Sequence, residues 1–182
     1  YVPFLQSEFV PQKASDVLVN KMGDCKDVVT LFIAMLKEIG INADYVLVRT
    51  QEDGKNYNAP PGMYFNHVIA ITYLNGEKQY YDLTATDYPC FTIPESLNET
   101  LALEIRNDVQ EPFYLKSGNL SDNRVLRSTT LIINKDNTAK MKIFSNKCGA
   151  SAVSMRSLYK NKSKEQRDKK LKEHNKKMYE NY

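Results

Sequence analysis

The sequence predicts an α+β fold in which a helix that begins at a cysteine packs on an antiparallel β-sheet. An apolar helical pattern starts at Cys25, two runs of strand-forming residues flank the turn signal Asn75-Gly76, and a second hairpin pattern occupies 127–146. A hydrophobic content of 42% and a charged content of 26% over 182 residues are typical of a globular domain with a good core.

Two helices are expected before the first strand. Ser15 is suited to cap a short helix over 16–21, which Gly23 ends. Asp24 is suited to cap a second helix over about 25–39, because its carboxylate can accept amide protons of the first turn. Apolar residues cover more than half the circumference of this second helix, so we expect it to be largely buried.

Strands and turns account for most of the remaining chain. Strands are expected at 43–50, 64–74 and 77–86, short strands near 101–106 and 113–116, and a second hairpin at 127–146. We interpret the loop 51–63 as a surface connection, with a lid that uses Tyr57 and Tyr64 as the alternative. The run SKEQ at 163–166 resembles a capping box that opens a terminal basic helix.

Charge is distributed unevenly along the chain. Residues 156–182 hold ten Lys and Arg against four acids, so the net charge of +3 leaves −3 for the preceding residues. We therefore expect no nucleic-acid partner. No apolar run approaches the roughly 20 residues of a spanning helix, so membrane contact is not expected for this segment. We predict one domain over 1–118, followed at 119–182 by a β-hairpin and basic helix that begin a further, truncated module.

The three cysteines are Cys25, Cys90 and Cys148. None lies at the short spacing from another that is typical of metal sites, so we expect no metal and no cofactor. Cys90 and Cys148 are expected to be structural or free thiols, with a disulfide between them as the alternative. Cys25 differs from both, because it lies at the start of a predicted helix, where unpaired first-turn amides favour a thiolate.

A reactive cysteine needs an acid–base partner, and the hairpin supplies one. His174 lies in the basic tail, which leaves His67. A turn at Asn75-Gly76 places His67, Ile69 and Asp82 on one face of the sheet, with His67 and Asp82 as diagonal neighbours within hydrogen-bonding reach. If the cysteine helix packs on that face, Cys25 meets the imidazole. The sequence then predicts Cys25 as nucleophile, His67 as general base and acid, and Asp82 as orienting carboxylate. Each residue alone has an ordinary structural interpretation.

The motifs that carry this argument, GDCKD, FNHVIAI and YYDLT, resemble in type and order the transglutaminase-like superfamily, whose members share a papain-like core. The resemblance covers about residues 9–95. More narrowly, the N-terminal segment is similar to large multidomain envelope proteins of Bacteroidetes-type bacteria. That similarity implies a periplasmic or cell-envelope location and flanking domains in a longer chain.

The resemblance implies thiol-dependent acyl transfer on the amide bond of a peptide or protein substrate. Hydrolysis is slightly favoured over transfer to an amine, because many bacterial relatives are thought to act as peptidases. The alternative is a catalytically idle module that binds a peptide or a partner protein. Many family members place an upstream tryptophan or glutamine in the oxyanion hole. This chain has no tryptophan, so Gln6 or Gln12, with the Cys25 amide, is the candidate donor.

Overall fold

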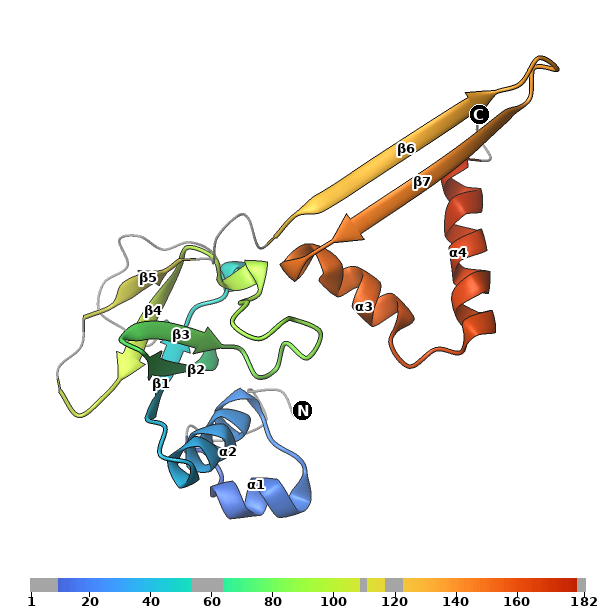
Figure 1. Cartoon of the computed structure of the whole chain (residues 1–182). Coiled ribbons are helices and arrows are strands. Elements are labelled where there is room, and N and C mark those ends of the chain that lie inside the picture. The colour runs from blue at the N-terminus through green and yellow to red at the C-terminus, as the bar shows by residue number, and fades with distance from the viewer. Residues whose placement is uncertain (1–9, 54–63, 109–110, 117–122, 180–182) are drawn as a thin grey trace.

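The structure is a computed structural model that describes residues 10–53, 64–108, 111–116 and 123–179. Its order is α1 (Ala14–Asn20), α2 (Cys25–Glu38), β1 (Ala43–Val48), β2 (His67–Leu74), β3 (Glu77–Tyr81), β4 (Thr100–Ile105), β5 (Phe113–Leu115), β6 (Val125–Ile133), β7 (Ala139–Lys147), α3 (Val153–Tyr159) and α4 (Lys164–Tyr179). The α+β fold is confirmed. Figure 1 shows α1 and α2 together beside the first sheet, and the β6–β7 hairpin apart from it.

Five antiparallel strands form the main sheet in the order β3-β2-β1-β4-β5. The β2–β3 register pairs Leu74 with Glu77 and Ala70 with Tyr81, as the Asn75-Gly76 turn predicts. Both turn residues have positive φ, 53° and 82°, which is the backbone of the hairpin turns that favour Asn-Gly. The turn therefore fixes the register on which the position of Asp82 depends.

The two faces of this sheet are buried by different elements. One face packs into a cluster with the chain around the 3-10 turn Glu95–Leu97. The buried residues of this cluster are Val46, Val48, Ile69, Ile71, Ile93, Leu97, Ala102 and Leu115. On the other face, Cys25 and Val29 of α2 pack against Val68 and Ala70 of β2. Side chains alternate between faces along a strand, so neighbouring residues of β2 serve the two clusters in turn.

The boundaries of α1 differ from the sequence expectation. The helix begins at Ala14, and Ser15 lies inside it, where its hydroxyl contacts the Asp16 carboxylate. The N-cap is Lys13, which makes no side-chain capping bond. Lys21, with φ of 53°, ends the helix in a left-handed conformation. Ser15 was the better capping residue by type, but α1 starts earlier, so that prediction was wrong.

Gly23 has a different role from the predicted helix stop. A Cβ atom placed on Gly23 would lie 2.6 Å from the Cβ atom of Asp27, closer than real Cβ contacts allow. The glycine therefore lets the chain pass directly against the first turn of α2. The buried residues of α2 are Cys25, Lys26, Asp27 and Val29, whereas Met35 and the C-cap Ile39 are exposed. The prediction of a largely buried helix was wrong, because only part of its circumference is covered.

The C-terminal part has its own two-stranded sheet. Strands β6 and β7 pair from Val125–Lys147 to Ile133–Ala139, and nearly all of their residues are exposed. The following residues contact the main domain through Lys160, whose ammonium lies 3.0 Å from the Asp87 carboxylate. Helix α4 starts at the predicted capping box, in which Ser163 and Gln166 each bind the backbone N–H of the other. No helix in the described residues is long and apolar enough to cross a membrane.

Candidate active site

The start of α2 is a buried turn that is capped by side chains. The Asp24 carboxylate accepts the N–H groups of Lys26 and Asp27, at 3.1 and 3.2 Å, and the Asp27 carboxylate accepts the N–H of Asp24 at 3.0 Å. Lys26 also places its ammonium against Asp24, and both side chains are nearly inaccessible. Cys25 thus lies between two carboxylates that are engaged in capping. The adjacent Lys26 charge offsets that of Asp24, a compensation that the sequence analysis missed.

Gln12 anchors this turn. Its backbone N–H and its side-chain amide both donate to Asp27, at 2.8 Å each. Burial raises the pKa of Asp27, but these bonds and the Asp24 N–H outweigh that effect and lower it below its usual value. Since the Gln12 amide nitrogen has two protons, a role as oxyanion donor would have to use the second one. Gln6, the other candidate donor, lies outside the described residues.

His67 and Asp82 form the polar pair expected from the hairpin register. Nε2 of His67 lies 3.2 Å from Oδ2 of Asp82, and the side chains are 12% and 5% exposed. The other Asp82 oxygen accepts the Thr84 hydroxyl at 2.7 Å and the Thr84 N–H at 3.0 Å. Sequence analysis did not identify Thr84, although an Asp followed two residues later by Thr is a common turn signal. Thr84 leaves Asp82 one oxygen for His67.

The Cys25 side chain also acts on His67. Burial lowers the pKa of His67, but the bond to Asp82 and the influence of Cys25 outweigh burial and raise it to about 9. Burial likewise raises the pKa of Asp82, and the bonds from His67 and Thr84 reverse this and hold it below its usual value. At neutral pH the imidazole is therefore protonated between a carboxylate and a sulfur atom. Cys25 and the hydrogen-bonded pair of His67 and Asp82 therefore lie together.

The route by which Cys25 reaches His67 differs from the expected one. The prediction placed the cysteine helix on the face that carries Ile69. Instead, α2 packs against Val68 and Ala70, and Ile69 belongs to the cluster on the opposite face. Contact is made because Cys25 is the first residue of α2 and His67 is the first residue of β2. At the end of a strand a side chain is not confined to one face by flanking neighbours.

Cys25 itself is 0% exposed. Its backbone N–H has no acceptor among the described residues, which leaves this donor available to an oxyanion.

Within the same described segments, no group of three or more His, Cys, Asp or Glu residues could hold a metal ion. Of the two residues in the alternative of a lid, Tyr57 lies outside these segments, and Tyr64 lies under the Arg49 guanidinium, with 5.7 Å to the ring centre. Cys90 and Cys148 are free thiols, so the alternative disulfide is absent.

Comparison with known proteins agrees with these motifs. Residues 4–83 match the family model of the transglutaminase-like superfamily, an interval that includes Cys25, His67 and Asp82. Neither the curated proteins nor the solved structures gave a significant match over the chain. Over residues 4–83, the chain is therefore similar to the transglutaminase-like superfamily.

Proposed function

We propose that the protein is a thiol enzyme that transfers the acyl group of an amide bond through a Cys25 thioester. The observation that carries this proposal is the hydrogen-bonded pair of His67 and Asp82 beside Cys25, which lies at a helix N-terminus. This combination is the one that activates a weak nucleophile, because a base accepts its proton and a third group orients the base. The dipole of α2 adds to the stabilisation of a thiolate at its N-terminus.

In the proposed reaction, the Cys25 sulfur attacks the amide carbonyl carbon, and the oxyanion that forms accepts the Cys25 N–H. As the C–N bond breaks, the His67 imidazolium gives its proton to the leaving amine. A water molecule or an amine then attacks the thioester carbon, and His67 takes up the proton of the attacking group. The C–S bond breaks, which releases the acyl product and restores the Cys25 thiolate beside the His67 imidazolium. Asp82 keeps the ring in the tautomer and orientation that both steps need. The same residues serve hydrolysis and transfer to an amine, and we favour hydrolysis.

A second function is favoured by one specific observation. Cys25 is 0% exposed, so no acyl donor reaches its sulfur in this arrangement of the chain. The enzyme proposal therefore requires a neighbouring segment to move when substrate binds. The competing proposal is a catalytically idle module, in which the same residues are a buried polar cluster and the domain binds a peptide or a partner protein, with flanking domains of a longer envelope protein around it.

The pH dependence of Cys25 alkylation distinguishes the two functions. Iodoacetamide modification would be followed by peptide mass spectrometry from pH 5.5 to 9.5, with the exposed Cys90 as internal reference. An ordinary thiol is only about 1% ionised near pH 6.5. If the enzyme proposal holds, Cys25 reacts at that pH at least about tenfold faster than Cys90. His67→Ala removes this advantage, whereas the matched variant His174→Ala retains it.

Two results would contradict the enzyme proposal. A Cys25 that follows the pH profile of Cys90 and does not respond to His67→Ala is an ordinary thiol. A Cys25 that no concentration of iodoacetamide modifies in the native protein, but that reacts after unfolding in urea, is permanently covered. The second result would leave the binding module as the better account of this domain.

A further inference from the structure

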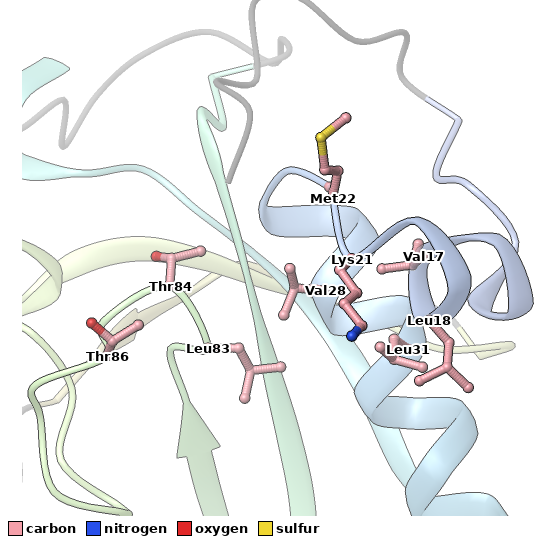
Figure 2. A pocket seen from close by; sticks show the side chains of 10 residues that line it. Val17, Leu18, Lys21, Met22, Val28, Leu31, Leu83, Thr84 and Thr86 are labelled. Carbon is pink, nitrogen blue, oxygen red and sulfur yellow. The ribbon is translucent and has the colours of Figure 1, made fainter.

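A pocket beside the candidate site is not used by the proposed mechanism. It has a volume of about 380 Å³, which is within the range of ligand pockets, about 300–1,000 Å³. Figure 2 shows side chains of α1, α2 and the intervening turn on one side of it, opposite the segment that follows β3. The lining residues are Val17, Leu18, Lys21, Met22, Gly23, Val28, Leu31, Leu83, Thr84 and Thr86.

The walls of this pocket are continuous with the residues of the site. Gly23 precedes Cys25 by two positions, so their Cα atoms are at most about 7 Å apart. Val28 follows Cys25 by three positions on α2, which places the two on one side of the helix. Across the pocket, Thr84 donates to Asp82. The pocket therefore adjoins the candidate site, although Cys25 itself does not line it.

The lining is mainly aliphatic and partly exposed. Leu18 and Met22 are 59% and 60% exposed, so they keep apolar surface in water at the mouth of the pocket. Burial of such surface is favourable by about 25 cal/mol per Å², which rewards an aliphatic occupant. A charged or strongly polar body would gain little from these walls.

Lys21 adds one cation to this apolar lining. Its ammonium has no carboxylate partner among the described residues, whereas the ammonium of Lys26 is paired with Asp24. An occupant with an aliphatic body and a carboxylate would satisfy both features, because the body meets the walls and the carboxylate meets the ammonium. The carboxylate could be a chain terminus or the side chain of an adjacent acidic residue.

We propose that this pocket binds an aliphatic residue of the peptide substrate next to the reacting carbonyl, with an accompanying carboxylate paired to Lys21. The inference rests on the proposed function and specifies its substrate class. It makes Leu18 and Met22 contacts for the aliphatic side chain, and Lys21 the contact for the carboxylate.

Cysteine-directed reagents with matched tails test this assignment. The probes are iodoacetyl-glycine, iodoacetyl-leucine, iodoacetyl-leucinamide and iodoacetyl-leucyl-glutamic acid diamide. In each case the sulfur displaces iodide and forms a freely rotating thioether, so the leucine can reach the pocket from either direction. Rates at Cys25 are divided by rates at Cys90 in the same sample. Iodoacetyl-leucine is expected to exceed iodoacetyl-glycine by about tenfold, the factor for partial burial of a leucine side chain.

Filling the pocket should remove this preference. Leu18→Trp and Met22→Trp are both at exposed lining positions, and each is expected to bring the leucine-to-glycine ratio close to one. Val19→Trp is the matched control, because Val19 is 78% exposed on the same helix and does not line the pocket. If the control changes the ratio as much as the pocket variants do, or if the parent ratio is already near one, the proposal is wrong.

The charge is tested separately. Lys21→Gln is expected to lower the rate with iodoacetyl-leucine by about two- to fourfold, the range of an exposed ion pair, while Lys13→Gln leaves it unchanged. The rate with iodoacetyl-leucinamide should not respond to Lys21→Gln. If Lys21→Gln lowers the rate of the glutamate-bearing reagent alone, the carboxylate belongs to a side chain of the substrate. If it lowers the rate of iodoacetyl-leucine alone, the carboxylate is a chain terminus. If all four reagents modify Cys25 at equal rates, the pocket assignment is wrong but the proposed enzyme function is unaffected. If iodoacetamide does not modify Cys25 at all, both the pocket assignment and the proposed function are wrong.

Discussion

Nε2 of His67 lies 3.2 Å from Oδ2 of Asp82, although fifteen positions separate the two residues in the chain. The hairpin turn produces this contact, since it fixes the register of β2 and β3. One nitrogen of the ring is held by the carboxylate, and the Cys25 side chain also acts on the ring. The pKa of His67 therefore depends on Asp82.

The first prediction concerns the titration of His67. Its pKa of about 9 depends on the Asp82 carboxylate, because burial alone lowers it. Asp82→Asn is expected to lower the midpoint seen in the His67 ring proton resonances by nuclear magnetic resonance, in a His174→Gln background that leaves one histidine. Asp87→Asn is the matched control, since Asp87 pairs with Lys160 instead. An unchanged midpoint in Asp82→Asn would remove Asp82 from the account of the site.

The second prediction is the pH dependence of stability. The folded-state pKa of His67 is raised from 6.5 to about 9, so its contribution is fully present below pH 6.5 and is lost as pH rises through 9. The pKa of Asp82 is lowered, so its contribution is present above about pH 4 and is lost in acid. Urea unfolding should show His67→Gln costing most between pH 4.5 and 6.5, by at most about 3 kcal/mol. A cost that does not shrink by pH 9.5 would contradict this linkage.

Local chemistry determined what the sequence could predict. Asn75-Gly76 fixed the β2–β3 register, and Asp24 fixed the start of α2, because each acts through backbone atoms within a few residues. Tertiary packing determines which face of the sheet α2 covers, and both faces are apolar. The prediction that favoured the Ile69 face was therefore wrong. The pairing of Gln12 with Asp27 joins positions fifteen apart without a periodic pattern, so nothing in the sequence indicated it.

The third prediction concerns the cap of α2. Asp24→Ala removes two capping bonds and a buried ion pair, so we expect a loss of at least about 2 kcal/mol in the free energy of unfolding. Ser163→Ala at the exposed start of α4 removes a comparable cap without burial and should cost about 1 kcal/mol or less. Chemical denaturation measures both. Equal costs would mean that the buried turn around Cys25 contributes no more than an ordinary helix cap.

The last prediction tests the boundary between the two parts of the chain. The main sheet ends with β5 at Leu115, and β6–β7 form a separate sheet that shares no strand with it. The two parts meet through polar contacts at Asp87, which accepts from Arg156 as well as from Lys160. Exposed ion pairs contribute about 0–1 kcal/mol each, so residues 1–118 alone should keep the fold and a melting temperature within about 5 °C of the full chain. The measurement is thermal unfolding by circular dichroism, together with the β2–β3 cross-strand proton contacts by nuclear magnetic resonance. A shortened chain that loses the contact between Ala70 and Tyr81 would show that the hairpin and basic helix are part of the same folding unit as the site.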